Sequence, residues 1–203
     1  MKHTAAALIA MFALLGCQKP PGPAPTAQAD GAAEPATQLP DQKEVQPADD
    51  DAPAGKVTVE IKDFDGIQEL IASKRGKVVV MDCWSTYCGP CVKEFPGLVA
   101  LGKEYGPGKL ACISLSFNYD GGKKETPEEH KEAVLEFLQS QQATFDNVIA
   151  SVPAETLYQQ LGFKSASVPA IFVYDREGNL ARQFEGGDAK YSDVGELVAK
   201  LLE

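Results

Sequence analysis

Two cysteines separated by two residues are the part of this sequence best suited to chemistry. Cys88 and Cys91 enclose Gly89 and Pro90 within the stretch CWSTYCGPCVKEFPG, residues 83–97. A pair of thiols at this spacing can hold a metal ion, close a structural bridge, or cycle between dithiol and disulfide. The residues around the pair decide among these three chemistries.

A metal site is the least favoured of the three hypotheses. A structural zinc site needs four ligands, usually two close pairs of cysteine or histidine. The remaining candidates offer no second pair, because Cys83 and Cys112 fall inside predicted strands and His130 lies on a polar helix face. We therefore expect no metal and no other cofactor, and we expect both strand thiols to be inert. A purely structural bridge is also disfavoured, because closing so short a loop constrains the unfolded chain little.

Redox exchange is favoured by the position of the pair. The apolar run Val78–Met81 predicts a strand buried on both faces of a parallel sheet, and the apolar residues after Cys91 recur at helical spacing. Cys88 thus lies where a strand ends and a helix begins. Unpaired N–H groups at a helix N-terminus stabilise a thiolate, so Cys88 should be the exposed nucleophile. Cys91, one turn further along, can attack a mixed disulfide at Cys88 and release the partner.

The elements around this junction predict an α/β domain. Runs with a period of two and continuous apolar runs favour strands, whereas apolar residues at helical spacing favour helices. Pro96 falls within the helix that follows the cysteines and should bend it, because proline removes a backbone hydrogen bond. We expect strands near residues 57–61, 77–84, 110–117, 145–150, 170–174 and 180–184. Helices should join the first five strands, a hairpin should join the last two, and a final helix should follow.

These features resemble the thioredoxin superfamily, and within it the TlpA/ResA-like group of membrane-tethered thiol–disulfide oxidoreductases. The segment Trp84–Cys91 is similar to the thioredoxin active site, and Cys91–Pro96 is similar to its kinked helix. An additional strand–helix segment between Leu110 and Gly162 is typical of the TlpA/ResA-like group. Over residues 57–203 the resemblance implies a thioredoxin fold, which is a central mixed sheet flanked by helices, here with an N-terminal strand–helix extension and an inserted strand–helix segment.

The resemblance also implies roles for residues outside the redox disulfide of Cys88 and Cys91. Asp82, six residues before Cys88, matches the family's buried acid. Burial should raise its pKa and make it a candidate to take the Cys91 proton. Val168-Pro169 matches the family's cis-proline loop, whose backbone could pair with an extended substrate chain. Because strand side chains alternate, Cys83 should point to the face opposite Asp82.

The residues nearest the sulfurs complete the substrate surface that the resemblance implies. Trp84 should form a wall beneath the site, with Tyr87, Gly89 and Pro90 around the cysteines. Tyr87 stands where the family usually has tryptophan, which bears on partner preference more than on the chemistry. The Gly-Pro pair is that of thioredoxin, which lies at the reducing end of the scale at about −270 mV. This choice favours a reductase.

The expected partners follow from a reductase that works among exported proteins. Relatives of this kind reduce apocytochrome c or other exported cysteines, so the disulfides and thiols of exported proteins are the expected clients. A reductant in an oxidising compartment must itself be recharged, which implies a membrane electron donor.

Two alternatives stay open. Peroxiredoxins share the fold but place threonine and proline where Ser85 and Met81 stand, so a peroxide pocket is not recognisable here. A thioredoxin-fold domain could also serve as a non-enzymatic binding module.

The composition argues against one class of partner. The chain of 203 residues carries 29 acidic and 19 basic residues, for a formal net charge of −10, and no cluster of lysine and arginine occurs. A protein that binds the phosphate backbone needs basic residues gathered on one surface. We therefore expect no nucleic-acid partner.

The N-terminal segment predicts export and anchoring. Residues 1–16 are interpreted as a signal peptide, because their apolar run is too short to span a bilayer as a helix. The segment Leu14–Cys17 resembles the lipobox of bacterial lipoproteins, which implies a lipid anchor on Cys17. Residues 17–55 are rich in proline, alanine and acidic residues and predict a disordered tether. The domain, residues 56–203, should then lie on the extracytoplasmic side of a bacterial cell envelope.

Overall fold

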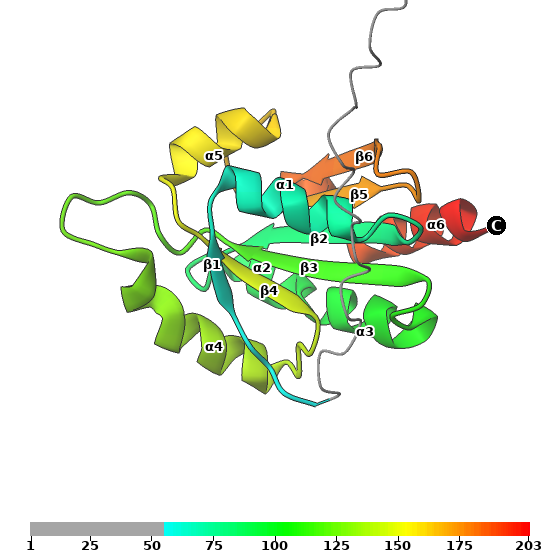
Figure 1. Ribbon diagram of the computed structural model, residues 1–203, viewed down its shortest axis with the longest axis horizontal. Coiled ribbons are helices and arrows are strands. Elements are labelled where there is room, and N and C mark those ends of the chain that lie inside the picture. Colours follow the sequence, from blue (N-terminus) through cyan, green and yellow to red (C-terminus); the bar gives the residue numbers. More distant parts are fainter. Residues whose placement is uncertain (1–54) are drawn as a thin grey trace, which may run out of the picture. The chain divides into compact units, whose positions relative to one another are not determined.

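The computed structural model describes residues 55–203, so the predicted signal peptide, Cys17 and nearly all of the tether lie outside the described residues. A six-stranded mixed sheet forms the centre of the domain, in the order β1-β4-β3-β2-β5-β6 (Figure 1). The strands are β1 (Glu60–Lys62), β2 (Val78–Trp84), β3 (Leu110–Ser116), β4 (Asp146–Ala150), β5 (Ala170–Tyr174) and β6 (Leu180–Glu185). The first four are parallel to one another, whereas β5 and β6 are antiparallel to their neighbours.

Strand β2 is the buried centre of this sheet. All seven of its residues are buried, as its continuous apolar run predicts. It pairs in parallel with β3, ending at Trp84 beside Ser116, and antiparallel with β5, where Cys83 lies beside Ala170. The end of β2, the end of β3 and the start of β5 therefore meet at one edge of the sheet.

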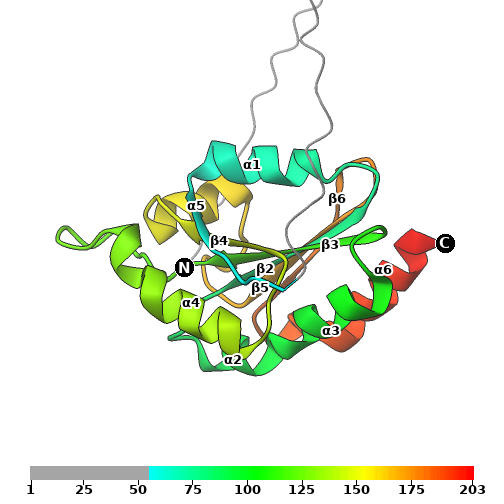
Figure 2. The same cartoon turned by 60° about the horizontal axis from the view of Figure 1, so that its bottom comes forward.

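Helices cover both faces (Figure 2). Helices α1 (Phe64–Ser73) and α5 (Ala154–Leu161) cover one face, with Ile67, Ile71 and Leu157 in its core. The other face, here called the cysteine face, is covered by α2 (Gly89–Glu94), α3 (Pro96–Tyr105), α4 (Lys131–Ser140) and α6 (Tyr191–Leu202). Two short 3-10 turns, Pro127–His130 before α4 and Gly186–Asp188 before α6, complete the described elements.

The expected mixed sheet flanked by helices is confirmed. Strand β1 and helix α1 form the N-terminal extension, and Asp63 caps α1 by accepting a hydrogen bond from the Gly66 amide at 3.0 Å. Strand β4 and helix α5 form the additional strand–helix segment, and β4 lies between β1 and β3 in the sheet. None of the helices in residues 55–203 combines the length and the hydropathy of a transmembrane span.

Where a bend was expected at Pro96, the structure has two consecutive helices. Helix α2 ends at Glu94 and α3 begins at Pro96, while Phe95 between them keeps helical dihedral angles of −52° and −37°. The Phe95 amide still donates to the Cys91 carbonyl at 2.9 Å, but Pro96 has no N–H to continue the series. The chain therefore keeps a helical path while its hydrogen-bond ladder is interrupted.

An aromatic cluster fixes this junction on the sheet. Phe95 is fully buried, with its ring centroid 5.0 Å from that of Trp84 on β2 and 5.0 Å from that of Phe137 on α4. The Trp84 and Phe137 centroids are 4.6 Å apart. Such ring pairs add to the stabilisation from apolar burial. The cluster thus holds α2, and the cysteines it carries, against the end of β2.

Candidate active site

The two cysteines of the motif form a disulfide at the start of α2. Cys88 is the N-cap of this helix and is half-buried, whereas Cys91 is 2% exposed. The Cys91 amide points at the Cys88 sulfur at 3.2 Å, and the Val92 amide donates to the Cys88 carbonyl at 3.0 Å. The more accessible sulfur therefore lies where backbone N–H groups can stabilise a thiolate once the bond is reduced.

A buried asparagine holds the turn that leads from β2 to Cys88. The Asn118 side chain, 4% exposed, accepts hydrogen bonds from the Thr86 amide at 3.0 Å and the Ser116 hydroxyl at 2.9 Å. Its amide group donates to the Thr86 hydroxyl at 2.6 Å. The Cys88 amide closes the same turn by donating to the Ser85 carbonyl at 3.1 Å. Asn118 thus ties the end of β3 to the segment that carries Cys88.

The buried acid lies on β2 and points to the cysteine face, as Val80 and Trp84 do. Asp82 is 3% exposed, and the Tyr191 hydroxyl of α6 donates to its carboxylate at 2.6 Å. Burial raises the pKa of Asp82 to about 7; the Tyr191 hydrogen bond lowers it and the Glu94 charge raises it. The expected direction is confirmed, so Asp82 can exchange a proton near neutrality.

The proline loop reaches the same edge of the sheet. The peptide bond between Val168 and Pro169 is cis, as the resemblance implied. Pro169 directly precedes Ala170, which pairs with Cys83, so the loop lies beside the end of β2. The Pro169 carbonyl accepts a hydrogen bond from the Gly186 amide at 2.9 Å, which ties the loop to the end of β6.

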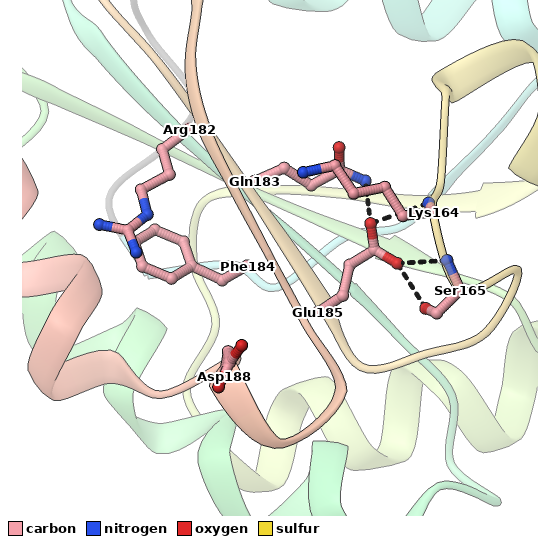
Figure 3. Close-up of a pocket in the computed structure, with 7 residues that line it drawn as sticks. All are labelled: Lys164, Ser165, Arg182, Gln183, Phe184, Glu185 and Asp188. Carbon is pink, nitrogen blue, oxygen red and sulfur yellow. Dashed lines mark hydrogen bonds between the residues drawn. The ribbon is translucent and has the colours of Figure 1, made fainter.

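A single carboxylate anchors the rest of this loop (Figure 3). Glu185, at the end of β6, accepts hydrogen bonds from the Lys164 amide at 2.9 Å and the Ser165 amide at 2.7 Å, and also from the Ser165 hydroxyl. The Gln183 amide group donates to the same carboxylate at 2.6 Å. Burial acts to raise the pKa of Glu185, but the hydrogen bonds from Ser165 and Lys164 outweigh it and lower the pKa. The ionised carboxylate therefore holds the segment that leads to Pro169.

Of the other residues expected at the site, some are buried beneath it and others are exposed beside Cys88. Trp84 is fully buried in the aromatic cluster, whereas Tyr87 is 78% exposed immediately before Cys88. Gly89 and Pro90, directly after Cys88 in the chain, are also exposed. Val168 is half-buried and contacts the apolar cores of both sheet faces.

The two remaining described thiols are free and buried on opposite faces. Cys83 belongs to the core under α1 and α5, and Cys112 belongs to the core of the cysteine face. Burial raises the pKa of Cys83 well above its usual range and that of Cys112 to about 12. Such thiols are poor nucleophiles. Among residues 55–203, no group of three or more potential ligands could hold a metal ion.

Asp82→Asn should change how stability depends on pH. The folded chain keeps a proton on Asp82 up to about pH 7, whereas the unfolded chain loses it near the ordinary value of 3.8. The wild type therefore loses stability between these values, by up to about 4 kcal/mol, and the variant does not lose this part. Urea unfolding from pH 4 to 8 measures the difference between the two proteins. A difference that stays constant over this range would contradict the assignment.

Asn118→Ala should both destabilise the domain and slow Cys88. Lost hydrogen bonds and unpaired partners should cost about 2–3 kcal/mol in urea unfolding. Alkylation of reduced Cys88 at pH 7 should slow by about three- to tenfold, because the turn no longer holds the thiolate at the helix start. Asn147→Ala is the matched control, since Asn147 is also 4% exposed and hydrogen-bonded but lies on β4. Equal effects of both variants on Cys88 alkylation would refute a specific role for Asn118.

Comparison with known proteins agrees with the geometry. No protein-family model matches the chain. The chain is 25% identical over 118 residues to "Thioredoxin-like protein YneN" and 25% identical over 127 residues to "Thiol-disulfide oxidoreductase ResA", both of Bacillus subtilis. These matches cover 58% and 62% of this chain, but only 62% and 63% of the relatives, which is less than two thirds of their length.

Solved structures show the same fold. A putative thiol:disulfide interchange protein DsbE from Chlorobium tepidum superposes with a TM-score of 0.52 at 22% identity, over 66% of this chain and 85% of that one. A DsbF homologue from Corynebacterium diphtheriae does so with a TM-score of 0.52 at 20% identity, over 64% and 75%. The chain thus contains a thioredoxin-fold domain, and its sequence relatives include a thioredoxin-like protein and a thiol–disulfide oxidoreductase.

Proposed function

We propose that this protein is a thiol–disulfide oxidoreductase that reduces disulfides of exported proteins. The observation that carries the proposal is the disulfide between half-buried Cys88 and buried Cys91 at the start of α2. Buried Asp82 on the same face of the sheet supports it, because it supplies a group that titrates near neutrality. The names of the sequence relatives support the same class of activity.

The reaction begins from the reduced protein. The Cys88 thiolate attacks one sulfur of a client disulfide, a new Cys88–client bond forms, and the other client sulfur leaves as a thiolate. Asp82 then accepts the Cys91 proton. The Cys91 thiolate attacks the Cys88 sulfur, the Cys88–client bond breaks, and the second client thiolate leaves to take a proton from water. Two electrons have passed to the client, and the protein holds the Cys88–Cys91 disulfide.

Client docking is proposed to use the surface around Cys88. Exposed Tyr87, Gly89 and Pro90 would contact the client beside the sulfur, and Trp84 would support the site from beneath. The backbone of Val168, next to cis Pro169, would pair with an extended client segment as an added strand. Glu185 supports this role because it anchors the same loop.

The cellular setting is part of the proposal. Residues 1–16 would direct export, lipid on Cys17 would anchor the chain to a membrane, and residues 17–55 would tether the domain on the extracytoplasmic side of the envelope. The clients would be disulfides of exported proteins, such as those of apocytochrome c. A membrane electron donor would return the Cys88–Cys91 disulfide to the dithiol after each cycle.

Reduction of insulin disulfides by the full chain, with dithiothreitol as electron source, tests the proposal. The wild type should accelerate precipitation of the insulin B chain, and Cys88→Ser should lower the rate to that of dithiothreitol alone, because the attacking sulfur is gone. Cys83→Ala is the control, since this buried thiol lies on the opposite face and should leave the rate unchanged. In a separate experiment, Cys91→Ser is first reduced and freed of dithiothreitol and then mixed with insulin; it should accumulate an insulin chain on Cys88, detected by mass spectrometry.

Two results would count against this activity. Equal insulin reduction by the wild type and Cys88→Ser would leave a binding module as the better account. Peroxide consumption by the reduced wild type, without insulin reduction, would favour a peroxide reductase.

A further inference from the structure

Tyr191 makes a buried contact with the Asp82 carboxylate. It is the first residue of α6, is 9% exposed, and donates its hydroxyl hydrogen to the Asp82 carboxylate at 2.6 Å. Within residues 55–203, this is the one hydrogen bond that the Asp82 side chain accepts. The two residues are 109 positions apart in the chain, so packing of α6 on the cysteine face creates the pair.

A glycine on α3 makes room for the tyrosine ring. Gly97 follows Pro96 at the start of α3, and a methyl group there would overlap the ring and Cβ of Tyr191. Close approach of α3 and α6 at this point therefore requires the absence of a side chain. Three elements, β2, α3 and α6, thus fix where the Tyr191 hydroxyl lies.

We propose that Tyr191 is a positioning residue that orients the Asp82 carboxylate and stabilises its ionised form, so that Asp82 can accept the Cys91 proton when the mixed disulfide is resolved. This inference rests on the proposed function. The proton moves from the Cys91 sulfur to an Asp82 oxygen, the Cys88–Cys91 bond forms, and the Cys88–client bond breaks. Tyr191 keeps its own proton throughout and acts only through Asp82.

Among the described groups that act on Asp82, Tyr191 is the one that favours the ionised carboxylate. Burial opposes ionisation of the carboxylate, and half-buried Glu94 on α2 opposes it further. The thiols of Cys83 on β2 and Cys112 on β3 have raised pKa values, stay protonated and add no positive charge. The pKa of Tyr191 is likewise raised well above its usual range by burial and by Asp82, so its hydroxyl remains a donor. A donor to the charged form lowers the pKa of a carboxyl group.

Tyr191→Phe tests the contact, because it removes one oxygen and keeps the ring against Gly97. The full chain is labelled at the side-chain carboxyl carbons of aspartate and titrated by NMR, with Asp82→Asn identifying the resonance. We expect the wild-type midpoint near 7 and the variant midpoint about one pH unit higher. Tyr174→Phe is the matched control, since Tyr174 is also 9% exposed but belongs to the core of the opposite face. It should leave the Asp82 midpoint unchanged.

Single-turnover resolution tests the role in the reaction. The reduced full chain is mixed with saturating disulfide peptide, and release of the second peptide thiol is followed from pH 5 to 9. The pH profile of Tyr191→Phe should shift upward by the same interval as its carboxyl titration, which lowers the rate at pH 7 by about three- to tenfold and leaves the plateau at high pH unchanged. A variant that was merely less stable would lower the plateau without moving the midpoint.

The outcomes separate the two proposals. An Asp82 midpoint that Tyr191→Phe does not move would refute the coupling, whatever the activity. A moved midpoint with an unmoved resolution profile would refute the role in proton transfer and leave the oxidoreductase proposal standing. If the wild type released no peptide thiol, the proposed function would fail and the role in proton transfer with it, while the titration alone would still decide the coupling.

Discussion

The burial of the Asp82 carboxyl group against Tyr191 is the interaction on which the account of this site depends. A carboxylate removed from water is destabilised unless it gains hydrogen bonds or a counter-charge, and here the gain is one hydroxyl donor at 2.6 Å. The balance places the pKa of Asp82 at about 7 instead of 3.8. The same arrangement that weakens the fold at neutral pH therefore places a carboxyl group that titrates near neutrality on the face of the sheet that carries Cys91, as the proposed proton transfer requires.

The topology explains why the remaining parts of the site meet at one place. Parallel strands β2 and β3 both end at the same edge of the sheet, and antiparallel β5 begins there. The turn to Cys88, the Asn118 side chain and the cis Pro169 loop are therefore neighbours, although they are distant in the chain. Hydrogen bonds from the Thr86 amide to Asn118, and from the Lys164 and Ser165 amides to Glu185, then fix the two loops at this edge.

Sequence reasoning succeeded where the information was local. The apolar run of β2, the position of Cys88 at a strand–helix junction and the opposite directions of Asp82 and Cys83 all follow from the period of the chain. The roles of Tyr191, Asn118 and Glu185 could not be predicted in this way, because each depends on contacts between elements far apart in sequence. The cis bond at Pro169 was predicted through resemblance, since no local pattern separates cis from trans.

Both the reaction and the proton transfer to Asp82 require Cys88 of the reduced protein to be an accessible thiolate near neutral pH, and alkylation measures this property most directly. The reduced full chain is treated with iodoacetamide at a series of pH values, and the modified cysteines are identified by mass spectrometry. We expect Cys88 to react with a midpoint below the ordinary thiol value of about 8.5, while Cys83 and Cys112 stay unmodified until the protein unfolds. A Cys88 that reacts with an ordinary or higher midpoint, or not at all in the folded protein, would contradict the account.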